Sequence, residues 1–453
     1  MHSIEQSRSA ILPTTSERDL HIAKSVAVAL WLAFAGNLGR GILHNNDLLR
    51  HIIFRPMVDA AGGILILQGI TTFLEGRRTS DNRRIRLLTC LVLVIALFAM
   101  AHGLISSPNI TLWFQTGLMG FGTAVAVFLA ARPLVFECVF RALRRQILVA
   151  DIFVAYVLLH WTNESRVGWF WTDQGNEALG AIANRSFFAL PFLIANYRRL
   201  DPWELFLVGA GFVEYLVLNL KGENRSAVII ALFVIPVLLF GITLRQRRSL
   251  QQIWKVALCA VIVTIALFHD VSWLDGFEHV MQRFGIADVS SAEPSEIMSD
   301  MNLNIMNDFT ENGARAEELR ELVSDTSFAQ FILGRGFGVS WYCPLWATFS
   351  TEWYMVHIGP GYMLLVGGLP LAISFTALLG LAIWKAWMNV NDAPGAAGAL
   401  IFLTAAAVNY MQHGPLLDEP EFYFLWLCIG FSVGVPRLYR LRGVIRPPTR
   451  VGA

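Results

Sequence analysis

Residues 87–106 read LLTCLVLVIALFAMAHGLIS, an apolar stretch without Asp, Glu, Lys or Arg. A helix of about 20 such residues crosses the hydrocarbon core of a bilayer, which is roughly 30 Å thick. Comparable stretches recur along the chain from Ala23 to Leu438. The whole chain is 55% hydrophobic and 15% charged, whereas soluble domains carry about one quarter charged residues. This composition disfavours a water-soluble fold and predicts a membrane protein.

The predicted spans are helices, because backbone amides within lipid must be satisfied inside their own segment. The alternating pattern of a β-barrel is not visible. The sequence thus predicts an all-α polytopic membrane protein with about 12 transmembrane helices. The expected spans are residues 23–43, 54–75, 87–106, 112–136, 147–162, 178–196, 204–220, 225–244, 253–269, 353–384, 396–413 and 421–438.

The orientation follows from the loops, because Lys and Arg concentrate on the cytoplasmic side of a membrane. Most of the 35 basic residues fall on one side when the N-terminus is placed inside. We therefore predict cytoplasmic tails at residues 1–22 and 439–453. The helices before the large loop occupy residues 23–269, the periplasmic loop occupies 270–352, and the remaining helices occupy 353–438. The cytoplasmic set of basic residues includes Arg132, Arg141, Arg144 and Arg145.

The large outer loop is strongly acidic. Between His269 and Glu352 it holds 14 acidic and 4 basic residues. Residues 312–324 are predicted to form an amphipathic helix, which we expect to lie across the mouth of the helical bundle. Its expected apolar positions are Ala316, Leu319, Leu322 and Val323, and its expected polar positions are Glu317, Glu318 and Glu321.

Basic residues that break the positive-inside trend are informative, because a cation in or beyond the membrane usually has a partner or a task. Lys221 and Arg225 lie in a tight outer turn before a span, where an ion pair with Glu223 is the alternative to a functional role. Arg185 lies inside a predicted span, and Glu214 lies at similar depth on the next one. An intramembrane ion pair between them competes with a substrate role for Arg185.

The segment Gly334-Arg335-Gly336-Phe337-Gly338 follows the loop helix. It resembles a backbone anion nest with an arginine in its middle, which makes Arg335 and Gly336 candidate substrate-binding residues. A plain turn is the alternative interpretation. A nucleotide site is disfavoured, because no strand precedes the motif and it lies outside the cell membrane.

His357 opens the next span, in HIGPGYMLLVGGLP. Residue type alone does not select it, since most of the 10 histidines fall at or beyond the outer face. Its position does, because it directly follows the acidic loop and lies on the same side as Arg225, Arg315 and Arg335. His413, at the end of a neighbouring span, is the rival candidate. The loop has no clustered Asp, Glu and His spacing typical of a metal site.

The order of these features matches a known pattern. The turn Asn224-Arg225-Ser226 heads a span, the outer loop carries Arg315 in GARAEELREL and closes on LGRGFG, and HIGPGYMLLVGGLP opens the following span. From Asn184 to Leu438 the chain thereby resembles the superfamily of O-antigen ligases and Wzy-type O-antigen (exopolysaccharide) polymerases. It departs from the family pattern at Asn224, where members often have Ser, and at Ile358, where they often have Asn.

The resemblance implies a glycosyltransferase of the bacterial cell inner membrane that joins glycans carried on undecaprenyl pyrophosphate at the periplasmic face, in exopolysaccharide or lipopolysaccharide biosynthesis. It implies that Arg225 and Arg315 face the pyrophosphate and that His357 acts near the acceptor hydroxyl. Guanidinium groups can stabilise a departing phosphate without a metal, and a neutral imidazole can accept a hydroxyl proton. One displacement would invert the anomeric configuration.

Several functions remain open at this point. Polymerase is preferred over ligase, because no lipid A or protein acceptor is indicated. A polysaccharide or lipid-linked oligosaccharide transporter is the alternative of another class, although the repeats and midplane polar sites of transporters are not visible. A scaffold would leave Arg185, Arg225 and His357 without a role. The expected partners are the bilayer, the lipid-linked oligosaccharide, and a chain-length regulator or other polysaccharide-assembly proteins. No cofactor, metal or nucleic acid is expected.

Overall fold

The structure is a computed structural model that describes residues 17–42, 50–75, 83–106, 108–161, 182–221, 225–246, 314–342, 356, 358–391, 393, 395–412 and 419–433. Within these ranges the chain is helical and contains no strand, which confirms the all-α class for the described part. Six helices there are long and apolar enough to cross a membrane. They are Glu17–Arg40, His51–Leu74, Arg83–Ile105, Ile110–Ala131, Ser226–Arg245 and Gly359–Asn389. The full set of about 12 spans stays a prediction, and the expected span at 253–269 lies outside the described residues.

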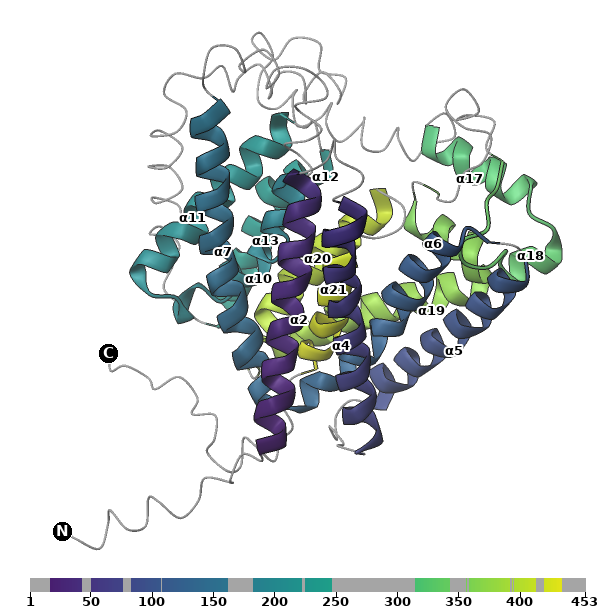
Figure 1. Cartoon of the computed structure of the whole chain (residues 1–453), viewed down its shortest axis with the longest axis horizontal. Coiled ribbons are helices and arrows are strands. Elements are labelled where there is room, and N and C mark those ends of the chain that lie inside the picture. Colours follow the sequence, from purple (N-terminus) through teal and green to yellow (C-terminus); the bar gives the residue numbers. More distant parts are fainter. Residues whose placement is uncertain are drawn as a thin grey trace, which may run out of the picture.

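Two long helices lie side by side at the start of the described chain (Figure 1). They are α2 (Glu17–Ile42) and α4 (Arg55–Leu74), and the latter follows η1 (Arg50–Phe54). Glycines allow a close approach, since a Cβ atom at Gly39 would lie 2.2 Å from the Phe54 ring. One at Gly36 would lie 2.7 Å from the Phe54 carbonyl oxygen. Such contacts through small residues are typical of helices that pack within a bilayer.

Hydropathy alone breaks one of the following helices, α7 (Pro133–Trp161), into parts of two expected spans. Their bounds are α5 (Arg83–Ile105), α6 (Ile110–Leu112), η2 (Trp113–Phe121), η3 (Thr123–Ala131) and α7 (Pro133–Trp161). The backbone of Arg132 is extended (φ −105°, ψ 113°), because a residue before proline is disfavoured in the helical region. Pro133 then opens α7, where its missing N–H is not needed. α7 runs without interruption from Pro133 to Trp161. The span expected at residues 112–136 therefore ends too late, and the break expected before the span at 147–162 is wrong.

Arg132 joins three helix ends at this break. Its side chain is fully buried and donates to the carboxylates of Asp19 and Glu75. Its Nε also donates to the Thr72 hydroxyl, at 2.9 Å. Arg18 pairs with Glu75 at 2.9 Å. Arg132, which charge counting assigns to the cytoplasmic basic residues, is therefore a buried connection between the start of α2, the end of α4 and the start of α7.

The helices between residues 182 and 245 are shorter and more interrupted. They are Ile182–Ala195, whose second half is α10 (Leu190–Ala195), then η4 (Tyr197–Arg199), α11 (Pro202–Lys221), α12 (Arg225–Ile229), η5 (Ile230–Val234) and α13 (Ile235–Arg245). Pro191 lies in the first turn of α10, where proline is tolerated. The last three elements follow one another directly, so one apolar helix runs from Ser226 to Arg245.

The described segment from residue 314 to residue 342 contains α17 (Ala314–Ser324) and α18 (Phe328–Leu333), and it lies at one end of the described helices (Figure 1). The helix expected at 312–324 is confirmed from Ala314 on. Leu322 is fully buried, as expected, but Glu318 is only 1% exposed and Val323 is 46% exposed. The expected assignment of these two residues to faces is wrong. Positions 318 and 322 lie one turn apart on the same face, and that face packs inward, with Leu319 beside it partly buried against the core as expected.

Three helices complete the described chain: α19 (Gly359–Asn389), α20 (Ala396–Gln412) and α21 (Glu419–Phe431). Aromatic side chains join α19 and α21 to η2. The ring of Phe121 lies 5.3–6.1 Å, between centroids, from those of Phe375, Phe422 and Trp426. Trp426 is fully buried and donates its Nε1 to the Gly120 carbonyl at 3.0 Å. This core fixes the position of α21, which forms one wall of the site described next.

Candidate functional site

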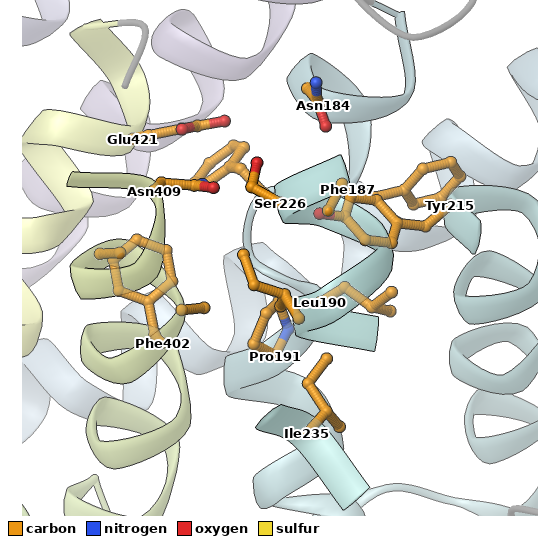
Figure 2. Close-up of a pocket in the computed structure, with 15 residues that line it drawn as sticks. Asn184, Phe187, Leu190, Pro191, Tyr215, Ser226, Ile235, Phe402, Asn409 and Glu421 are labelled. Atoms are coloured by element: carbon orange, nitrogen blue, oxygen red, sulfur yellow. The ribbon is translucent and has the colours of Figure 1, made fainter. Parts of the chain in front are cut away.

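A cavity of about 270 Å³ opens where Ile182–Ala195, α12, α20 and α21 meet (Figure 2). Its polar lining residues are Asn184, Tyr215, Ser226, Asn409 and Glu421. Most of the other walls are apolar, formed by side chains such as Phe187, Leu190, Pro191, Ile235 and Phe402. A mostly apolar cavity with a few convergent polar groups is the usual form of a small-molecule site.

The polar residues gather at one end of the cavity. Figure 2 shows Asn184, Ser226, Asn409 and Glu421 there, with Pro191, Phe402 and Ile235 further along. Asn184 and Ser226 lie near the starts of their helices, Asn409 lies in the last turn of α20, and Glu421 lies in the first turn of α21. In the predicted orientation all four of these helix ends face the periplasm.

The walls around these polar groups are closely packed. A Cβ atom at Gly398 of α20 would lie 2.5 Å from the Phe192 ring, so only glycine allows α20 to approach α10 this closely. The Phe424 ring of α21 lies 4.8 Å from that of Phe402 and 5.3 Å from that of Phe192, between centroids, and both pairs are edge-to-face. Rigid helices with interlocked aromatic rings hold the polar side chains in fixed positions.

Two of the arginines singled out in the sequence adjoin this cavity along the chain. Arg225 is the first residue of α12, directly before Ser226, and Arg185 directly follows Asn184. For Arg225, and likewise for Lys221 at the end of α11 and Arg315 in the first turn of α17, the structure describes the backbone. His357 and His413 lie outside the described residues, as does Glu223.

The ion pair between Arg185 and Glu214, one of the two alternatives for Arg185, is not found among the described residues. Glu214 instead lies near Asp151 of α7, and the two residues are 5% and 6% exposed. An oxygen of Asp151 lies 2.9 Å from where a Cβ atom of Gly211 would be, so this glycine makes room for the carboxyl group. Two buried carboxyl groups thus lie where α7 and α11 pack together. Asp151 escaped the sequence analysis, because hydropathy treats a single acid in a span as a minor interruption.

Most backbone amides of the segment Gly334–Gly338 donate hydrogen bonds within the protein. Its glycines have φ values of 75°, 95° and 76°, as a nest requires, but the amides are already bonded within the protein. The Arg335 amide donates to the Leu365 carbonyl at 2.6 Å, and the Gly336 amide donates to the Val366 carbonyl at 3.0 Å. The Arg335 guanidinium pairs with the Asp325 carboxylate at 2.7 Å. These contacts favour a structural turn over a substrate-binding loop.

The reason for these bonds is a break in α19. Gly368 has a non-helical backbone (φ 67°, ψ −172°), and Pro370 follows within the same helix. Because Pro370 has no N–H, the Val366 carbonyl loses its usual helical donor. The Gly336 amide supplies the missing hydrogen bond, which matters most in lipid, where no water replaces it. The sequence signal for this break is the run GGLP inside a predicted span.

We predict that Gly336→Ala destabilises the protein by roughly 2–4 kcal/mol, through a strained backbone and overpacking. The φ of Gly336 is +95°, and a Cβ atom there would lie 2.3 Å from the backbone of Gly103. Thermal unfolding of the purified protein in detergent measures the change. Gly380→Ala on α19 is the matched control, because nothing lies within 4 Å of its added methyl group. Equal midpoints for Gly336→Ala and wild type would contradict the assigned packing.

The fold and the cavity together define a membrane-embedded helical protein with a small, partly polar cavity at the ends of several helices. No family model matches the chain, and a search of curated proteins finds no match either. Among the described residues, no group of three or more His, Cys, Asp and Glu side chains is placed to hold a metal ion.

Proposed function

We propose that the chain is a membrane glycosyltransferase that joins undecaprenyl-pyrophosphate-linked glycan repeat units at the periplasmic face of a bacterial inner membrane, as an O-antigen or exopolysaccharide polymerase. The sequence resemblance supplies the class of reaction. One structural observation supports it most directly: the polar end of the cavity is built from Asn184 and Ser226, the chain neighbours of Arg185 and Arg225. The cavity thus adjoins two residues of a type suited to bind an anion.

In this proposal the pyrophosphate lies at the start of the helix that Arg225 opens. The dipole of the helix that runs on to Arg245 favours an anion at its start. Arg225 and Arg315 stabilise the charge that develops as undecaprenyl pyrophosphate departs. His357 accepts the proton of the attacking hydroxyl. The anomeric carbon then bonds to the acceptor oxygen as its bond to the phosphate oxygen breaks.

The undecaprenyl chain stays in lipid beside the protein. The helix that Arg225 opens carries exposed apolar side chains along its length, including Val237 at 65%, Phe240 at 50% and Leu232 at 41% exposure. A polyprenyl tail that follows this face places its pyrophosphate at the level of the helix start. No water-filled path for the tail is then needed.

A ligase that transfers the glycan to lipid A-core or another acceptor is the alternative within the same chemistry. A transporter is the alternative of another class, and the break in α19 at Gly368 is the observation that favours it, because broken helices often line transport sites. At this break, however, the carbonyls of Leu365 and Val366 accept hydrogen bonds from the amides of Arg335 and Gly336. The broken helix is therefore stabilised from within the protein, without a transported ligand.

We predict that the purified protein forms new glycosidic bonds when incubated with undecaprenyl-pyrophosphate oligosaccharide from the bacterium that encodes it. Mass spectrometry of the products should show chain growth for a polymerase, or transfer to an added acceptor for a ligase. Because the proposed stabilisation comes from arginines, EDTA should leave the rate within a few-fold. Translocation of the lipid across vesicles without any new bond would instead establish the transporter.

A further inference from the structure

The chain after α17 is held at the edge of two candidate spans. The helices Arg83–Ile105 and Ile110–Ala131 are both long and apolar enough to cross a membrane, and only residues 106–109 separate them. Two spans that follow each other so closely have their adjoining ends at one surface of the bilayer. The Asn109 amide donates to the Gly338 carbonyl at 2.8 Å. Gly338 therefore lies at the level of this membrane surface.

The same part of the chain lies alongside α5 and α19 rather than beyond their ends. A Cβ atom at Gly336 would lie 2.3 Å from the backbone of Gly103, in the last turn of α5. A Cβ atom at Gly368 would lie 2.2 Å from the Ile332 carbonyl oxygen. Gly368 follows the first residue of α19 by nine positions, which is about 14 Å along a helix axis. α18 therefore lies beside these two spans, and Figure 1 shows it next to the end of α5.

α18 presents apolar side chains on its outside at this level. Its sequence, FAQFIL, contains no charged residue. Phe331 packs against the core. By contrast, Phe328 is 82% exposed, Leu333 is 43% exposed and Ile332 is 36% exposed. Phe328 and Ile332 lie one turn apart and share a face of the helix. A helix that faces water carries polar residues on its exposed face, so this pattern indicates apolar surroundings.

The polar groups that flank α18 have partners within the protein. Ser327 and Gln330 form a capping box, in which each side chain accepts a hydrogen bond from the other residue's amide, at 3.3 and 3.1 Å. Asp325 and Arg335 are the charged residues nearest to α18 in the sequence, and they pair with each other at 2.7 Å. Such partners replace hydrogen bonds to water, which a helix close to lipid requires.

The exposed side chains of α18 adjoin the apolar outer surface of α5. α5 is a candidate span whose exposed side chains include Leu97 at 57% and Phe98 at 53% exposure. In its last turn Leu104 is 52% exposed and Ile105 is 83% exposed. These two residues directly follow Gly103, the residue of α5 that the segment after α18 contacts. The apolar surface of a span thus continues toward α18, and the occupant of that surface on a span is lipid.

We propose that α18 lies in the membrane interface and that Phe328, Ile332 and Leu333 contact lipid. The partner is the bilayer, because the apolar surface of α5 leads onto this helix. Apolar side chains at such a boundary insert between the headgroups and the acyl chains. Through α18 the bilayer also fixes the position of α17, which carries Arg315 in its first turn. The inference stands apart from the proposed function and holds equally for a polymerase, a ligase or a transporter.

Quenching of a single fluorescent label tests this contact. The five native cysteines of the full-length protein are replaced by alanine, and Phe328→Cys or Ile332→Cys is labelled with bimane in lipid nanodiscs. A nitroxide on the acyl chain of the lipid should quench both labels to within about twofold of Ile105→Cys, the control at the exposed end of α5. Iodide in the water should quench them several-fold less than Glu317→Cys, the control at an exposed position of α17.

The other outcomes would overturn the inference. Strong quenching by iodide with weak quenching by the nitroxide would place α18 in water. Weak quenching by both would show that another part of the chain or a second protein covers the helix.

A second measurement keeps the test decisive if the protein without cysteines does not fold. p-Benzoylphenylalanine takes the place of Phe328 in the otherwise wild-type chain, and irradiation in nanodiscs should yield lipid adducts that mass spectrometry detects. Adducts from the same photoreactive residue at Ile105 but none at Phe328 would contradict the lipid contact. Neither measurement involves glycan transfer, so a failure of this inference is distinguishable from a failure of the proposed function.

Discussion

Replacing Arg225 or Arg315 with Ala is expected to slow glycan transfer on the order of 10²-fold or more, by analogy with the loss of an oxyanion donor. Both variants should also bind the lipid-linked donor more weakly, because the proposed contacts to pyrophosphate exist before the reaction and strengthen as charge develops. Lysine should restore little activity, since an ammonium group cannot reproduce the planar fork of a guanidinium. Initial rates and donor affinity measured on the same preparations check this prediction.

The matched comparison is His357→Ala, which should behave differently. Donor binding should stay nearly intact while turnover falls by roughly 10²–10⁴, the usual range for a lost general base. His413→Ala is the control for the rival base. If His413→Ala abolishes turnover while His357→Ala retains the wild-type rate and protein level, the assignment of His357 is wrong. Normal transfer by Arg225→Ala would exclude that arginine from the pyrophosphate site.

Replacing Arg132 with Ala is expected to cause the largest loss of stability, about 3–5 kcal/mol, because it removes the cation from between two partly buried carboxylates. The fully buried guanidinium reaches Asp19, Glu75 and the Thr72 hydroxyl together. Lysine offers no planar fork, so Arg132→Lys should recover only part of the loss. The unfolding midpoint in detergent and the yield of monodisperse protein measure the effect.

Arg141→Ala is the control for this prediction, because Arg141 is an exposed arginine on the same helix, α7. Its removal should change the midpoint by a degree or two at most, since surface substitutions are usually within about 0.5 kcal/mol. Comparable midpoints for Arg132→Ala and Arg141→Ala would show that the buried cluster does not stabilise the bundle.

Hydropathy predicted the helical class and many helix positions, because a long apolar segment in lipid can satisfy its own backbone hydrogen bonds only as a helix. It failed where a helix continues beyond its apolar stretch. α7 runs on through Arg141 and Arg144, and Arg144 finds partners in the Glu204 and Asp201 carboxylates. Polar residues that form ion pairs with a neighbouring helix keep a helix intact, and no single-sequence hydropathy window records that neighbour.

The roles of the site residues chosen from the sequence stay predictions. Sequence reasoning found Arg185 and Arg225 from their unusual position relative to the membrane, and both adjoin the cavity along the chain. It missed Asn409 and Glu421, because single polar residues near span ends look like ordinary interface residues. A usable signal was present, since Asn184, Ser226, Asn409 and Glu421 all fall near predicted periplasmic span ends. Only the packing of the four segments brings these polar groups to one cavity.

The hydrogen bonds between the segment Gly334–Gly338 and the broken α19 have a consequence for engineering the protein. The joint is made by main-chain atoms of Arg335, Gly336, Leu365 and Val366, so its geometry depends on chain register more than on side-chain identity. Replacement of the sequence between residues 314 and 342 should be tolerated when the spacing from Ser327 to Gly338 is kept. Insertion of one residue within that spacing would shift every amide away from its carbonyl. The segment that carries Arg315 would then lose its fixed position over the bundle.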